Sequence, residues 1–228
     1  METQINLMSQ LTFKFPFRTS YFEKDFYVSS NNFAVYKLIE SWPNWPDKWV
    51  NIYGPTGSGK THLSNILKKK MNSAYLDSMN IKKDLISEME NYNCIIIDNY
   101  NKNIEEKILY SILNHSKQLD KFVVINSYEP IGEIKVNLKD LHSRLKSFIP
   151  FGIDLPTDEL LRVILTKTFS DKQIEINSKV LEYILKNIER SYEKINSFSN
   201  SIDSLSLAKA QPIKLQLIKK VLNEIRVQ

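Results

Sequence analysis

Eight consecutive residues early in the chain have the types and the spacing that bind phosphate. They read Gly54-Pro55-Thr56-Gly57-Ser58-Gly59-Lys60-Thr61. Glycines let the main chain turn tightly and approach an anion, whose oxygens then meet successive main-chain N–H groups. Lys60 can reach the β- and γ-phosphates of a nucleotide, and the Thr61 hydroxyl can ligate Mg²⁺. The match to the phosphate-binding pattern G-x-x-x-x-G-K-T is complete, so this loop, with the adjacent His62, predicts a nucleotide site.

A second chemical element is an apolar run that ends in a carboxylate. Cys94–Ile97 is apolar throughout, and Asp98 follows it. A buried strand that ends in Asp can deliver its carboxylate to the shell of Mg²⁺, so Asp98 is predicted to hold the ion with Thr61, partly through water. Many ATPases of this type carry another acid at the next position, where this chain has Asn99. An amide cannot accept a proton, so we expect intrinsic ATP hydrolysis to be slow or absent.

A third polar group ends the apolar run that starts at Phe122. Asn126 or Ser127 could contact the γ-phosphate or the attacking water there, and Ser127 is taken as the catalytic candidate. The alternative is that either residue merely closes the turn after the strand.

The elements that must position these groups alternate along the first two thirds of the chain. Five apolar runs have the length and composition of buried strands: Trp49–Tyr53, Ser73–Asp77, Cys94–Asp98, Phe122–Asn126 and Phe151–Asp154. Helical patterns lie between them: Lys60–Met71, Ile81–Glu90, Ile104–Gln118 and Leu138–Lys146. Strands that alternate with helices predict an α/β domain with a five-stranded parallel sheet covered on both faces.

Beyond Asp154 the strand pattern stops and only helical patterns remain. They cover Asp158–Phe169, Ser178–Asn187, Tyr192–Leu207 and Ile213–Val227. We therefore expect three parts: a flexible tail over residues 1–20, the α/β domain over 21–155, and a small all-α domain over 156–228.

Composition and charge exclude some classes of protein for this chain. Hydrophobic residues make up 42% of 228 residues, which is enough for a packed core. The net charge of +5 is spread over many lysines and does not by itself indicate nucleic-acid binding, so direct DNA binding is expected to be weak or absent. The one cysteine excludes a disulfide framework, and no apolar run reaches membrane-spanning length. The chain also lacks a signal-peptide pattern, so we expect a cytoplasmic protein.

Together these features resemble the AAA+ ATPases, and within them the DnaA family. The segment Phe26–Ala34 is similar to the pattern F-x-V-G-x-x-N that borders the adenine in that family, with Ser29 in place of the glycine. The resemblance implies that the chain has a P-loop AAA+ domain followed by a helical lid. It also implies that Val28 borders the base, and that the ligand is ADP or ATP with Mg²⁺.

Two arginines gain candidate roles from the resemblance. Asp140–Leu145 is similar to the family element L-x-S-R-L/F, which implies that Arg144 is a finger acting in trans on another subunit. Ile188–Ser191 resembles the lid segment whose arginine, here Arg190, touches the nucleotide. The alternatives are that Arg144 pairs with a carboxylate on its own surface, and that Arg190 caps the end of the preceding helix.

Within the family the chain is similar to Hda-like proteins, the regulatory inactivators of DnaA. The sequence shows neither the long N-terminal domain of DnaA nor its DNA-reading helix-turn-helix domain, and it carries the Asp98-Asn99 pair. The tail residues Gln10, Leu11 and Phe13 resemble the peptide Q-L-x-L/F that docks on the polymerase sliding clamp. The alternative is that the tail phenylalanines pack on the protein's own surface.

This resemblance implies a regulator of replication initiation that binds ADP or ATP, docks on the clamp and stimulates ATP hydrolysis by DnaA through Arg144. A self-dimer is compatible with it. Two other functions stay open: an ATPase that loads a helicase or remodels single-stranded DNA, and an adaptor that uses nucleotide only as a structural ligand.

Overall fold

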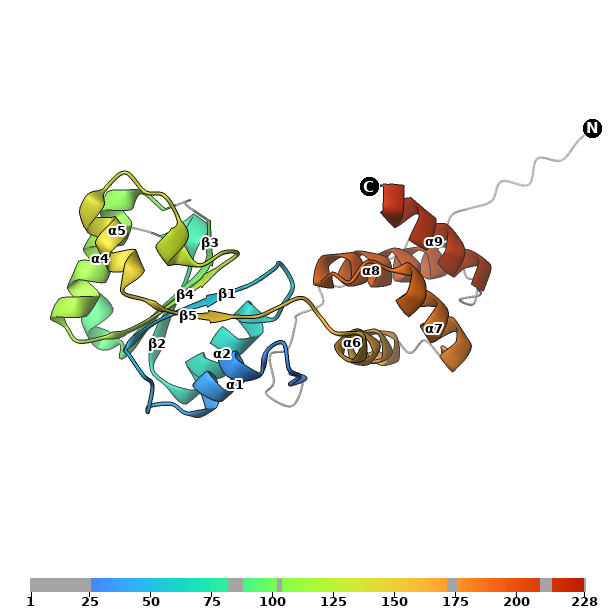
Figure 1. The fold of residues 1–228 in the computed structure, drawn as a ribbon, viewed down its shortest axis with the longest axis horizontal. Coiled ribbons are helices and arrows are strands. Elements are labelled where there is room, and N and C mark those ends of the chain that lie inside the picture. The colour runs from blue at the N-terminus through green and yellow to red at the C-terminus, as the bar shows by residue number, and fades with distance from the viewer. Residues whose placement is uncertain (1–25, 82–87, 102–103, 172–175, 210–214, 228) are drawn as a thin grey trace, which may run out of the picture. The chain divides into compact units, whose positions relative to one another are not determined.

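The computed structural model describes residues 26–81, 88–101, 104–171, 176–209 and 215–227 (Figure 1). The chain forms two compact units that are joined between Leu155 and Pro156. One unit comprises Tyr21–Leu155 and carries all strands of the described residues; the other contains Pro156–Gln228 and, where described, is helical.

The first unit is built on a five-stranded parallel sheet in the order β2-β3-β4-β1-β5. Its strands are β1 (Trp49–Tyr53), β2 (Ser73–Asp77), β3 (Cys94–Tyr100), β4 (Phe122–Ser127) and β5 (Ile149–Gly152). Because every strand runs the same way, the residues that follow β1, β3 and β4 all emerge at one edge of the sheet. The α/β class and the parallel five-stranded sheet predicted from the sequence are confirmed.

Helices cover both faces of this sheet (Figure 1). They are α1 (Phe33–Glu40), α2 (Lys60–Lys70), α4 (Glu106–Gln118) and α5 (Lys139–Lys146). Successive strand residues point to opposite faces. Ile95 and Ile97 therefore pack in a cluster with α4 and α5, while Cys94 and Ile96 pack in a second cluster with α1 and α2. Burial on both faces explains why β3 is apolar until it reaches Asp98.

Short 3-10 turns occur at Ser78–Asn80 (η2), Met89–Asn91 (η3) and Ile131–Glu133 (η4). The predicted helix Ile81–Glu90 falls largely on residues 82–87, which lie outside the described residues.

The structure differs locally from the prediction at several places, among them β3, which continues to Tyr100 beyond the predicted end at Asp98. The last strand lies two residues earlier than the predicted Phe151–Asp154, because Ile149 already pairs with Val50 of β1. Asp154 leaves the ladder, since its N–H donates to the carbonyl of Asn31, 3.0 Å away. Helix α1 was not predicted; its buried face is formed by Val35, Leu38 and Ile39, at helical spacing.

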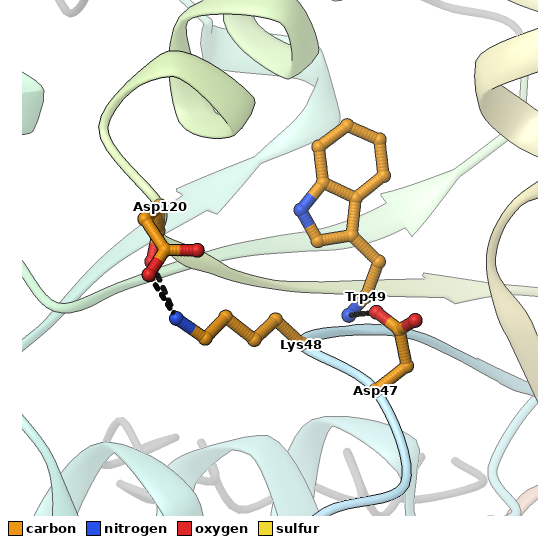
Figure 2. Close-up of polar contacts among 4 residues, drawn as sticks. All are labelled: Asp47, Lys48, Trp49 and Asp120. Carbon is orange, nitrogen blue, oxygen red and sulfur yellow. Dashed lines mark hydrogen bonds and ion pairs between the residues drawn. The ribbon is translucent and has the colours of Figure 1, made fainter.

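Polar side chains tie together the amino-terminal ends of β1 and β4. Lys48 donates to the carboxylate of Asp120 and to its main-chain carbonyl, and Asp47 accepts the N–H of Trp49 at 3.1 Å (Figure 2). Asp120 has a left-handed φ of 55°, which turns the chain from α4 into β4. This edge is opposite to the one at which the glycine-rich loop emerges.

The second unit consists, in its described part, of α6 (Asp158–Asp171), α7 (Ser178–Asn187), α8 (Tyr192–Lys209) and α9 (Leu215–Val227). Its core includes the large buried side chains of Phe169 and Phe198, whose ring centroids lie 6.5 Å apart. The Asn177 side chain accepts from the N–H of Val180 and caps α7. No helix in the described part of the chain combines the length and the apolar character needed to span a membrane.

Candidate phosphate and magnesium site

The glycine-rich loop connects β1 to α2 and depends on its glycines. Gly57 and Gly59 have φ of 80° and 98°, a region in which residues with a Cβ are strained. A Cβ on Gly54 would lie only 2.6 Å from the carbonyl oxygen of Ile153. The N–H of Gly54 donates to the carbonyl of Ser127 at 3.2 Å, which fixes the loop to the end of β4.

Lys60 lies across this loop. Its ammonium donates to the carbonyl oxygens of Gly54 and Pro55, at 2.7 and 2.9 Å. Burial lowers the pKa of Lys60 to about 8, and the charge of Asp98 opposes that shift. A phosphate oxygen could replace either carbonyl as the acceptor for the ammonium. The buried hydroxyl of Ser58 has no hydrogen-bond partner in the described part of the chain, so the loop also contains an unsatisfied donor.

The lowered pKa predicts that nucleotide affinity depends on pH. A bound phosphate stabilises the charged form of Lys60, so affinity should be constant below about pH 8 and should fall as pH rises through about 8. The fall approaches about tenfold per pH unit until the pKa of the bound state is reached. Titrating the chain with ADP between about pH 7 and about pH 10 measures it.

Lys60→Arg is the matched control for that titration, because a guanidinium stays charged over the whole range. An affinity for ADP that falls equally in both proteins would show that Lys60 is not the titrating group.

Asp98 is the centre of a hydrogen-bond network at the end of β3. It is 2% exposed. Its Oδ2 accepts from the Thr61 hydroxyl at 2.8 Å and from the Tyr75 hydroxyl. Its Oδ1 accepts from the Asn126 amide at 2.8 Å and from the N–H of Asn99 at 3.0 Å. The structure thus brings Thr61 and Asp98 together, as a shared metal ion would require.

The donor set of this pair fits Mg²⁺. The ion prefers oxygen ligands and is commonly held by one or two protein groups together with phosphates and water. Thr61 supplies a hydroxyl and Asp98 supplies a carboxylate. The described residues contain no group of three or more His, Cys, Asp or Glu side chains that would suit a metal held by protein alone.

Ser127 and Asn126 lie in different environments. The Ser127 hydroxyl donates to the carbonyl of Glu129 at 2.6 Å and accepts from the amide of Asn51 at 2.9 Å, so it holds the turn after β4. The Asn126 amide reaches both Asp98 and the hydroxyl of Ser64, and the Asn126 carbonyl oxygen is buried without a partner in the described residues. The structure places Asn126, and not the hydroxyl of Ser127, beside Asp98.

Aromatic side chains flank the start of α2. The ring of Phe26 stacks on Tyr36 with centroids 5.9 Å apart and meets His62 edge-on at 5.5 Å. Phe26 also covers Gly59, where a Cβ would lie 2.9 Å from its ring. Val28, two residues further on, is partly buried. The sequence pattern over Phe26–Ala34 was used to place Val28 beside the base. Phe26, the first residue of the same pattern, contacts the glycine-rich loop.

The segment that carries Phe26 and Val28 is tied to the end of β5. The Asn31 amide donates to the carbonyl of Asp154 at 3.2 Å, and the Asn32 amide donates to the carbonyl of Tyr27 at 3.0 Å. Through these bonds, the two asparagines hold the segment that is expected to border the adenine next to the phosphate loop.

Arg144 lies at the other edge of the sheet. It comes from α5 and donates to the Asn114 carbonyl oxygen of α4 at 2.9 Å. It lines a cavity of about 250 Å³ that also includes Trp49, the first residue of β1. The phosphate loop starts beyond the last residue of β1, and five strand residues span about 16 Å. Arg144 is therefore not placed to act on the phosphate site of its own chain.

That cavity is rich in cationic side chains. Besides Arg144 it is lined by Lys48, Lys117 and Lys121, with the carboxylates Asp47 and Asp120. Lys117 and Arg144 also line an adjoining cavity of about 290 Å³. The alternative was a pairing of Arg144 with a carboxylate; among the described residues its hydrogen-bond partner is instead the side-chain amide of Asn114.

Arg190 belongs to the helical unit and pairs with Asp158 in the first turn of α6. Two of its nitrogens donate to the two carboxylate oxygens, at 2.5 and 2.8 Å. The hydrogen bond from Arg190 lowers the pKa of Asp158, and the same bond raises the pKa of Arg190. The expected nucleotide contact of Arg190 stays a prediction. The tail residues Gln10, Leu11 and Phe13 lie outside the described residues.

Comparisons with known proteins agree with this geometry. The family model described as the KAP family P-loop domain matches residues 31–209. Over 251 residues the chain is 25% identical to the chromosomal replication initiator protein DnaA of Buchnera aphidicola subsp. Cinara cedri, covering 98% of this chain and 56% of that protein. DnaA of Campylobacter jejuni serotype O:6 is 26% identical over 197 residues, which cover 77% of this chain and 44% of that protein. The chain thus spans about half the length of the curated relatives it matches.

Among solved structures, domain III of Thermotoga maritima DnaA superposes with a TM-score of 0.73 at 16% identity, covering 92% of this chain and 99% of that domain. The AMPPCP-bound DnaA of Aquifex aeolicus superposes with a TM-score of 0.65 at 17% identity, covering 90% of this chain and 69% of that chain. These likenesses show the AAA+ fold: a P-loop α/β domain followed by helices.

Proposed function

The chain belongs to the KAP family of P-loop domains and is similar in sequence to the initiator DnaA, and from this premise we propose that it is a nucleotide-binding regulator of replication initiation. Its ligand is ADP or ATP with Mg²⁺. The observation that carries the proposal is the joint placement of three groups: the loop with Lys60 after β1, Thr61 at the start of α2, and Asp98 at the end of β3.

A small number of groups at this loop would bind the nucleotide, and each has a different role. The main-chain N–H groups and the start of α2 attract the phosphates, and Lys60 adds a full positive charge. Thr61 and Asp98 would hold Mg²⁺, which neutralises charge on the phosphates when bound. The ring of Phe26 covers Gly59 at one side of the loop.

Hydrolysis of the chain's own ATP is expected to be slow. The position after Asp98 is occupied by Asn99, whose side chain cannot accept a proton from water. Asn126 likewise presents an amide to Asp98 and not a base. We propose that the bound nucleotide sets the conformation of the chain, and that ATP hydrolysis occurs on a partner.

The proposed partner is DnaA, as in the Hda-like proteins that the chain resembles. Arg144 lies at the sheet edge opposite to its own phosphate loop, where it could meet a nucleotide held by a neighbouring subunit. An arginine supplied in trans stabilises the charge that develops on the transferred phosphoryl group. The cationic cavity around Arg144 would favour such an approach electrostatically. A self-dimer through the same edge is compatible with this geometry.

Docking on the sliding clamp is proposed through the tail residues Gln10, Leu11 and Phe13. Replacing both Gln10 and Leu11 with alanine should abolish capture of the clamp by the immobilised chain, because the amide and one apolar anchor are lost. A pull-down with purified clamp measures the effect. Thr12→Ala, at the variable position of the peptide, is the matched control and should retain binding. Equal capture by the double variant would contradict the role of the tail.

A further inference from the structure

A tyrosine that the sequence patterns did not single out contacts the carboxylate at the centre of the site. Tyr75 comes from β2 and lies opposite Ile96 of β3, and its hydroxyl donates to Oδ2 of Asp98. The Tyr75 ring packs against the cluster that joins α1 and α2 to the sheet, and the ammonium of Lys68 lies 5.6 Å from its centroid. Removing the hydroxyl alone would therefore leave the packing of the ring in place.

The carboxylate of Asp98 is saturated by donors from the protein itself. An ionised carboxylate offers about four lone-pair positions. Thr61 and Tyr75 occupy two on Oδ2, while Asn126 and the N–H of Asn99 occupy two on Oδ1. A metal ion or a metal-bound water that approaches Asp98 must replace one of these donors.

The four donors differ in how readily they can be replaced. The N–H of Asn99 belongs to the main chain, and Asn126 is fully buried and also bonded to Ser64. The Thr61 hydroxyl needs only to turn its proton away, because its oxygen would itself face the metal. Once the Thr61 proton has turned away, the hydroxyl of Tyr75, at the end of a side chain from the neighbouring strand, is the donor that remains on Oδ2.

We propose that the Tyr75 hydroxyl competes with Mg²⁺, or with a water on the ion, for Oδ2 of Asp98. The competition weakens the contribution of Mg²⁺ to nucleotide binding, so the chain holds its nucleotide with little dependence on the metal. This inference rests on the proposed nucleotide site and concerns the regulation of that site.

The test is the affinity of the purified chain for a fluorescent ADP, measured with EDTA and with a graded series of Mg²⁺ concentrations. In Tyr75→Phe, Mg²⁺ should increase the affinity about tenfold more than it does in the wild type, because a hydrogen bond to a charged group no longer has to be broken. Affinity in EDTA should be the same in both proteins, which also shows that the variant is folded. Tyr92→Phe removes a hydroxyl from a ring that packs with the cluster on the α4 and α5 face of the sheet, and it should behave like the wild type.

The outcomes separate the two levels of the proposal. An equal Mg²⁺ effect in the wild type and Tyr75→Phe, or a smaller effect in the variant, overturns the competition while leaving the nucleotide site intact. A wild-type chain that binds no ADP in either condition overturns the proposed function, and the competition falls with it.

Discussion

Replacing Arg144 with alanine should abolish the stimulation of DnaA ATP hydrolysis by this chain. The expected loss in rate is about 10³-fold or more, the range measured for arginines supplied in trans. The structure contributes two reasons. Arg144 lies at the sheet edge away from its own phosphate loop, and within the part of the chain that the structure describes its guanidinium donates to a neutral group, the side-chain amide of Asn114. The measurement is turnover of DnaA-bound ATP with clamp loaded on DNA.

The matched control for this substitution is Arg162→Ala. Arg162 is an arginine on the surface of the helical unit that pairs with Glu182, and exposed pairs of that kind contribute little. The control should stimulate DnaA like the wild type. If Arg144→Ala also stimulates fully, Arg144 does not act as a finger, and the trans mechanism has to be given up even if the chain binds nucleotide.

Gly54→Ala should have the largest effect on the fold of the phosphate site. The new Cβ would lie 2.6 Å from the main-chain carbonyl of Ile153, and a main-chain atom cannot move aside as a flexible side chain can. Backbone strain and overpacking together predict a loss of about 2–4 kcal/mol in the free energy of unfolding. Denaturant unfolding measures the loss, and nucleotide binding should weaken with it because the loop is displaced.

Gly132→Ala provides the comparison within the same domain. A Cβ on Gly132 would come no closer than 3.6 Å to its nearest neighbour, which is an ordinary contact. Its unfolding free energy should stay within about 1 kcal/mol of the wild type. Equal stability of the two variants would mean that the close approach of Gly54 to Ile153 does not constrain the loop.

The sequence predicted those parts of the fold that depend on local patterns. The glycine spacing located the loop, and the apolar run before Asp98 located the strand that carries it, because both signals lie within a few neighbouring residues. The bounds of β5 were less accurate. Its pairing begins at Ile149, and its end depends on a hydrogen bond between Asp154 and Asn31, which are far apart in the sequence.

The partners around Asp98 could not be predicted in the same way. Tyr75 and Asn126 reach the carboxylate from strands on either side of β3, and only the order β2-β3-β4 makes them neighbours. The sequence offered Asn126 or Ser127 and named Ser127 as the catalytic candidate, but the alternation of side chains along β4 places Asn126 on the face of Ser64 and Asp98. For Arg144 the alternative to a finger role was a pairing with a carboxylate on the protein's own surface. In the structure its guanidinium donates to the side-chain amide of Asn114 on the neighbouring helix α4.

Equilibrium titration of the purified chain with ADP and ATP tests the central claim most directly. The wild type should bind an adenine nucleotide saturably, and Lys60→Ala should weaken that binding by at least about tenfold, the loss expected for one charge-assisted contact. A wild type without measurable affinity, or a Lys60→Ala variant that binds as tightly as the wild type, would contradict the assignment of this loop as a nucleotide site.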